Sequence, residues 1–198
     1  MLILLAMLAA APPVLDADPG RAALICRAAA VSGLDSLPLE TSMQFAYYTM
    51  TAARALPGDE DYFHKMAAVP ANSAPAAARE DAPALRALCD ERFPLARRTG
   101  EVTLPPTALE SDLMCAGVTT VFAGAARGYG ERTGDNAPFR RLQTIAYHYQ
   151  SRAAIDMTQR GITTPDAQRR ALGEQIFASL DIGNAGAIAD ICEAQAEG

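Results

Sequence analysis

The chain contains no tryptophan, a single lysine and two histidines among its 198 residues, and these shortages limit the chemistry that it can carry. His64 and His148 stand in no His-Glu-x-x-His or Cys-x-x-Cys pattern, so the spacing of a zinc site is missing. The sequence also lacks Cys-x-x-Cys-His, which excludes covalent haem attachment through that motif. Serine and cysteine nucleophiles need a positioned base, and no triad can be nominated. We therefore expect no catalytic residue, no metal site and no cofactor.

The chain also lacks an excess of positive charge. The formal net charge is -6 and the isoelectric point is about 4.9, so the chain lacks the basic footprint of a nucleic-acid-binding protein. Lys65 is the only lysine among 17 basic residues, and the arginines are scattered among acidic residues. Such scattering indicates a solvated surface and not an anion site. We attribute the preference for arginine to a GC-rich bacterial genome and expect no nucleic-acid partner.

Long apolar runs are confined to the amino terminus. Residues 1–11 are apolar throughout, and the sequence turns polar at Asp16. This run has the length of a signal peptide, and Ala17 is a suitable last residue of the removed segment. It departs from the usual pattern because no lysine or arginine precedes it, and the alternative is a buried first helix of a cytosolic protein. We expect a signal peptide over residues 1–17, a periplasmic or secreted product, and no membrane insertion of the mature chain.

A pattern of residues occurs twice, at an offset of 100. Asp-x-x-Pro at 35–38 recurs at 135–138, and Phe-Ala-Tyr-Tyr at 45–48 recurs as Ile-Ala-Tyr-His at 145–148. A cysteine lies upstream and another downstream of each copy. Two copies of one order of residues predict two similar structural units in tandem.

The four cysteines, Cys26, Cys89, Cys115 and Cys192, are an even number, which together with an export signal predicts disulfides. The repeat favours Cys26–Cys89 and Cys115–Cys192, so that each unit has its own bridge. Closing loops of roughly 60 to 80 residues contributes about 4 kcal/mol per bridge on the chain-entropy model. Pairing Cys26 with Cys115 and Cys89 with Cys192 also respects the repeat, but it joins the two units.

The composition favours helices, because alanine and leucine abound and runs of β-branched residues are few. Asp18-Pro19 and Thr164-Pro165 have the pattern of a helix cap followed by a first-turn proline. We predict an all-α protein of two tandem helical-bundle repeats, each with one disulfide. The repeats cover residues 18–93 and 112–198, and a proline-containing linker covers residues 94–111.

Three tyrosines are the candidate binding surface. Tyr47 and Tyr147 are the aromatic positions that the two copies share, and each either packs in the core or lines a groove between helices. Tyr129 lies in the glycine-containing segment 127–136, which has no counterpart in the first copy. We predict that this segment is a loop between a helix ending near residue 126 and the helix that carries Tyr147. A loop present in one copy only is a candidate for a function specific to that copy.

These observations favour an exported helical binding or interaction module without catalytic activity, whose partner is an unknown protein or a small apolar ligand. A structural or envelope-stress protein with no small ligand is the alternative, and an enzyme is the third possibility. An apolar cleft lined by Tyr47 or Tyr147 would favour binding, whereas a buried carboxylate with a strongly shifted pKa in a pocket would favour catalysis.

Overall fold

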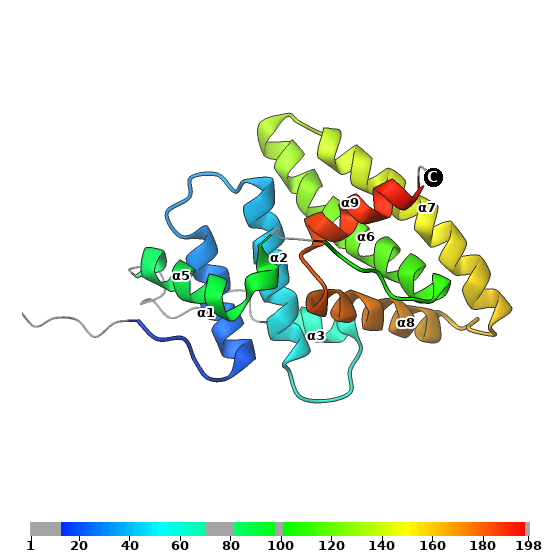
Figure 1. The fold of residues 1–198 in the computed structure, drawn as a ribbon, viewed down its shortest axis with the longest axis horizontal. Coiled ribbons are helices and arrows are strands. Elements are labelled where there is room, and N and C mark those ends of the chain that lie inside the picture. Colours follow the sequence, from blue (N-terminus) through cyan, green and yellow to red (C-terminus); the bar gives the residue numbers. More distant parts are fainter. Residues whose placement is uncertain (1–12, 70–80, 98–100, 197–198) are drawn as a thin grey trace, which may run out of the picture.

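The computed structural model describes residues 13–69, 81–97 and 101–196, and every regular element in these ranges is helical (Figure 1). The predicted all-α class is confirmed. The elements, in chain order, are α1 (Pro19–Val31), α2 (Leu39–Arg54), α3 (Tyr62–Ala68), α5 (Ala82–Arg92), the 3-10 turn η1 (Pro94–Ala96), α6 (Ala108–Thr133), α7 (Ala137–Gln159), α8 (Pro165–Ala178), the 3-10 turn η2 (Ser179–Asp181) and α9 (Ala185–Ala196).

Local capping explains where several helices begin. The Asp18 carboxylate accepts a hydrogen bond from the Arg21 backbone N–H at 2.8 Å and starts α1, with Pro19 in its first turn. The Thr164 hydroxyl accepts the Ala167 N–H at the start of α8, again followed by a proline. Each cap satisfies a backbone donor that has no partner inside the helix. Both starts are where the sequence predicted them.

The predicted loop at 127–136 is wrong, because α6 continues through it to Thr133. Gly134 adopts a left-handed conformation with φ of 82° and ends the helix. Gly130 lies where the chain turns back, and a Cβ there would overlap the Asn136 carboxamide. Gly128 therefore sits inside a helix at a cost of about 1 kcal/mol relative to alanine. Gly130 is also helical, but there the Asn136 side chain leaves no room for alanine. Ser111 and Asp112 are the caps that the sequence predicts for this helix, but α6 begins earlier, at Ala108, because the Thr107 hydroxyl accepts the Glu110 N–H and caps it.

Some sequence predictions fall on residues outside the described ranges. One is most of the predicted signal peptide. The proline-containing stretch 70–75 predicts a turn and the residues from 76 onwards predict a helix, and the turn and the start of this helix also lie outside the described ranges. The sequence predicts a short helix over residues 59–69. It begins at Tyr62, because the Asp61 side chain accepts the His64 N–H and caps it. The segment 94–111, predicted as a linker, supplies buried Ala96, Val102 and Leu109 to the core.

Two disulfides tie the first and last helices of each half of the chain. Cys26 on α1 bonds to Cys89 on α5, with their Cα atoms 5.6 Å apart, and Cys115 on α6 bonds to Cys192 on α9, with their Cα atoms 5.7 Å apart. The pairing within each half is confirmed, and the pairing that joins the halves is excluded.

The two halves lie side by side, and α2 of the first half faces the second half (Figure 1). One buried cluster joins α6, α7 and α9, while a second joins α1, α2 and α5. The second cluster also contains Ile176 and Leu180 from the second half, so the halves share a core. Among the described helices, none combines the length and the hydrophobicity that crossing a bilayer requires.

Candidate functional site

Tyr47 lies in the core between the halves. Its side chain is 6% exposed, and its hydroxyl donates a hydrogen bond to the Leu180 carbonyl at 3.1 Å. Its ring meets that of Tyr48 edge to face. Burial raises the pKa of Tyr47, as expected for a phenol removed from water. Tyr47 thus joins the two halves and does not line any of the pockets described below.

Tyr147 lies in the opposite environment. It points outward from α7 with 61% of its surface exposed. Tyr129 is half-buried on α6 and does not line the groove beside Tyr147. The structure therefore does not bring the three predicted tyrosines together, and only Tyr147 borders an open groove.

This groove, of about 300 Å³, lies between α6 and α7 and its lining is more apolar than polar. It is formed by Thr120, Ala123, Gly124, Arg127, Phe139, Gln143, Ala146, Tyr147 and Gln150. We call this the α6–α7 groove. The small residues Ala123, Gly124 and Ala146 leave the space open, and a Cβ added at Gly124 would meet no atom within 4 Å. Gln150 donates its amide to the Thr120 hydroxyl at 3.0 Å, which fixes one wall.

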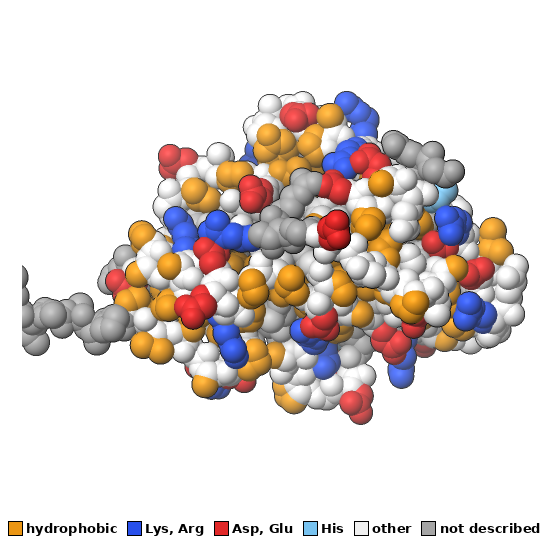
Figure 2. Space-filling view, viewed as in Figure 1, with side chains coloured by type: hydrophobic (Ala, Val, Ile, Leu, Met, Phe, Trp, Pro, Cys, Tyr) orange, Lys and Arg blue, Asp and Glu red, His pale blue; other side chains and the backbone are white. Residues whose placement is uncertain are grey.

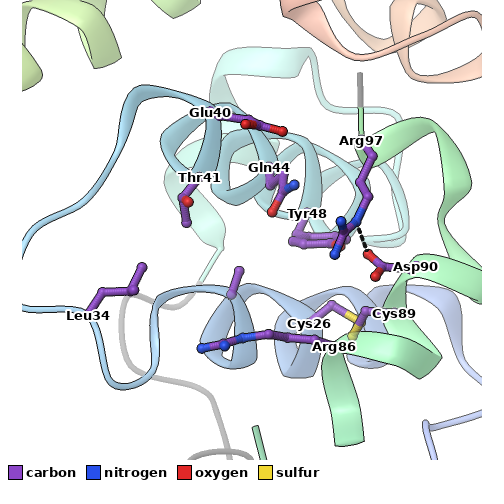
Figure 3. Close-up of a pocket in the computed structure, with 11 residues that line it drawn as sticks. Cys26, Leu34, Glu40, Thr41, Gln44, Tyr48, Arg86, Cys89, Asp90 and Arg97 are labelled. Carbon is purple, nitrogen blue, oxygen red and sulfur yellow. Dashed lines mark hydrogen bonds and ion pairs between the residues drawn. A yellow bond between two sulfur atoms is a disulfide. The ribbon is translucent and has the colours of Figure 1, made fainter. Parts of the chain in front are cut away.

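A second pocket, of about 250 Å³, lies in the first half between α1, α2 and α5 (Figure 3). The Cys26–Cys89 disulfide forms one wall, and Glu40, Thr41 and Gln44 of α2 face it from across the pocket. This lining is more polar than apolar. Its residues lie on separate segments and form no local motif, which is why sequence reasoning did not find the pocket.

Three charged groups of this second pocket, those of Arg86, Asp90 and Arg97, already have partners. Arg97 donates its Nε to the Asp90 carboxylate at 2.6 Å (Figure 3). Arg86 donates to the Ala29 and Ser32 carbonyls at 2.8 and 2.6 Å, and so ties α5 to the end of α1. Burial, helped by nearby Asp90, raises the pKa of the lining residue Tyr48 to about 12. These contacts stabilise the wall and leave the disulfide flanked by a salt bridge.

The two histidines occupy different settings. His64 Nδ1 lies 2.9 Å from the Asp61 carboxylate, and Asp61 also accepts a hydrogen bond from Arg169 at 2.9 Å. The His64 backbone N–H and the Arg169 guanidinium hold the pKa of Asp61 well below its usual range. His148 is exposed on α7, with its ring edge to face with Tyr149. In the described part of the chain, no three His, Cys, Asp or Glu side chains gather as metal ligands would.

One carboxylate is buried with a raised pKa. Asp112 is 3% exposed, and burial raises its pKa even though Arg152 donates to it at 3.0 Å. It lines none of the pockets described above, so it does not meet the criterion that would favour catalysis. Its role is to hold α6 and α7 together through Arg152.

Charges of both signs are interspersed over the face shown in Figure 2, without a large field of either sign. Comparisons of the chain with protein-family models, with curated proteins and with solved structures found no match. The function is therefore argued from the molecule itself.

Proposed function

We propose that the protein is an exported binding module that recognises an apolar or aromatic group in the α6–α7 groove and acts without catalysis. One observation carries the proposal: Tyr147 is 61% exposed at the edge of a groove of about 300 Å³ whose lining is mostly apolar. An exposed aromatic ring beside a hollow is the composition that binding surfaces favour.

The surroundings of the groove support binding. Between Arg141 and Arg152, the exposed positions of α7 carry no Asp, Glu, Lys or Arg and consist of Thr144, Tyr147, His148, Gln150 and Ser151. The centres of protein interfaces are depleted of charge and enriched in tyrosine. These positions of α7 therefore lack the mixture of charges that the face in Figure 2 shows.

Two further parts of the proposal concern architecture and compartment. Each half has two helices in close antiparallel contact and a disulfide between its first and last helix, which supports an origin from one duplicated unit. Structural disulfides form and persist in oxidising compartments. Together with the apolar run at residues 1–11, they support export to the periplasm or beyond, with residues 1–17 removed.

A crosslinking experiment tests the proposed binding surface. The photoreactive amino acid p-benzoylphenylalanine is placed at position 147 or, as a control, at position 155 in the full-length protein in producing cells. Ile155 lies on the same helix and is 60% exposed, but it does not line the groove. We expect covalent adducts from position 147 and few from position 155, with mass spectrometry distinguishing a small apolar ligand from a protein.

Equal adduct yields from both positions would contradict a specific surface. A complete lack of adducts would favour the alternative, a structural or envelope-stress protein with no ligand at this groove.

A further inference from the structure

The residues of α7 that line the α6–α7 groove are the repeat counterparts of a face that is already an interface. At the offset of 100 residues, Phe139, Gln143, Ala146, Tyr147 and Gln150 correspond to Leu39, Met43, Ala46, Tyr47 and Met50 of α2. The five positions of α7 that line the groove therefore each have a counterpart on one face of α2.

That face of α2 packs on the second half of the molecule. Leu39, Met43 and Ala46 pack against the cluster of α6, α7 and α9. Tyr47 donates to the Leu180 carbonyl, and Met50 lies in the same buried cluster as Ile176 and Leu180. A Cβ at Gly186 of α9 would lie 3.1 Å from the Met43 sulfur, so the helices approach closely. In the first half, this pattern of residues makes a surface onto which helices dock.

We propose that the α7 face docks a second copy of this chain, in a twofold arrangement that places Tyr147 of each copy in the α6–α7 groove of the other. The inference rests on the proposed function, because it takes the same groove as the binding surface and names the partner.

The shape of the face suits pairing with itself. A projecting aromatic ring, Tyr147, stands directly beside a hollow kept open by Ala123, Gly124 and Ala146. A twofold axis brings like surfaces together, so a projection and a hollow that adjoin on one copy meet the hollow and projection of the other. In the first half, α2 presents the counterpart Tyr47 to a neighbouring helix surface in the same manner.

The polar chemistry of the face points to the same partner. Copies of a chain with a net charge of -6 repel one another, so a contact between them adds least to this repulsion where the contacting surfaces carry few charges. Gln143 and Gln150 line the groove, and the Gln150 amide gives one N–H to the Thr120 hydroxyl. A glutamine amide has two N–H donors and one oxygen acceptor, so both side chains can still donate and accept. Such groups can hydrogen-bond to the same group of the other copy across a twofold axis, whereas a carboxylate or a guanidinium would face a group of the same charge. The one charged lining residue, Arg127, lies 3.6 Å from Glu131 of its own helix.

Sedimentation velocity of the purified mature protein across a range of concentrations tests this pairing. We expect a reversible dimer, and Tyr147→Arg should weaken the association at least about tenfold by placing a cation in the groove of the other copy. The matched control, Ile155→Arg, adds the same charge at an equally exposed position of α7 and should leave the association unchanged. Far-ultraviolet circular dichroism and the melting temperature of the monomer should match the wild type in both variants, because both side chains are exposed.

A chain that stays monomeric at all concentrations would overturn the inference, as would an equal loss of association in Ile155→Arg. The crosslinking experiment separates this failure from that of the proposed function. An adduct from position 147 with twice the mass of the chain supports both ideas. An adduct with another protein or a small ligand keeps the binding surface and rejects the second copy, and the lack of any adduct rejects both.

Discussion

Two tyrosines at the same position of the sequence pattern that occurs twice have opposite surroundings, and this contrast decides what each side chain does. Tyr47 is 6% exposed and donates to the Leu180 carbonyl, whereas Tyr147 is 61% exposed at the groove. The same helix position thus holds the two halves together through Tyr47, whereas in the second half its counterpart Tyr147 is available for binding. In the sequence the two tyrosines look equivalent. The contact with the second half that buries Tyr47 exists only in the folded chain, so the sequence does not reveal it.

Truncation should separate the two roles. Tyr47→Ala removes a buried ring and a hydrogen bond between the halves, so we expect a loss of about 3 to 5 kcal/mol in unfolding free energy. Tyr147→Ala removes an exposed ring and should change stability by no more than about 0.5 kcal/mol. Urea denaturation at concentrations where the chain is monomeric measures both. Similar losses in the two variants would show that the exposure of Tyr147 has been misjudged.

Asp61 provides a pH-dependent link between the halves. Its carboxylate accepts hydrogen bonds from the His64 N–H in the first half and from Arg169 in the second, and its folded pKa lies below the usual value. The unfolded pKa of an aspartate is about 3.9. The link is therefore fully present above about pH 4 and is lost as the pH falls through the lower folded pKa.

We expect Asp61→Asn to destabilise the protein at pH 6 and to lose this effect progressively towards pH 2. Asparagine keeps the helix cap, so the variant isolates the charge. Asp166→Asn, which removes an 85% exposed carboxylate in contact with the same Arg169, is the control and should have a smaller effect. Urea unfolding at several pH values checks the prediction, and a destabilisation that is independent of pH would contradict it.

At the scale of single helices, starts are easier to predict than ends. Asp18-Pro19 and Thr164-Pro165 act through contacts within a few residues, so the sequence alone locates α1 and α8. α6 ends at Gly134, but Gly128 and Gly130 precede it, and the sequence does not show which of these glycines adopts the left-handed conformation that ends the helix. The three glycines therefore predict a loop where the structure has a helix.

The two pockets also differ in how far the sequence predicts them. The sequence predicts Tyr147 as a binding residue because it belongs to the pattern that occurs twice, and in the structure Tyr147 borders the α6–α7 groove. The polar pocket in Figure 3 combines α1, α2 and α5, and no spacing in the sequence brings these residues together.

Two glycine-to-alanine changes in helix interiors should have effects of opposite sign. At Gly173 of α8, a Cβ would lie 2.6 Å from the Tyr62 Cβ, so α3 and α8 must separate. We expect Gly173→Ala to cost about 1 to 3 kcal/mol. At Gly128 of α6, the nearest atom is the mobile end of Arg132 at 3.5 Å, and Gly128→Ala should stabilise the helix by up to about 1 kcal/mol. Thermal unfolding measures both, and no gain from Gly128→Ala would contradict the extension of α6 through this segment.

At the scale of the whole molecule, the halves are closed separately but packed as one body. Each disulfide lies within its own half, while Ile176 and Leu180 of the second half complete the core of the first. The repeat in the sequence predicted the disulfide pairing, because the order of cysteines was already doubled. It did not predict the contribution of α8 and η2 to the first half, because nothing in the doubled pattern specifies how the two halves pack against each other.

The central claim is that two helical units, each closed by its own disulfide, make up an exported protein. Peptide mapping by mass spectrometry of protein isolated from producing cells, without reduction and with free thiols blocked, tests it most directly. The account predicts linked peptides Cys26–Cys89 and Cys115–Cys192, no blocked cysteine, and a chain that begins at Asp18. Linked peptides that join the halves, or four blocked thiols on a chain that retains residues 1–17, would contradict it.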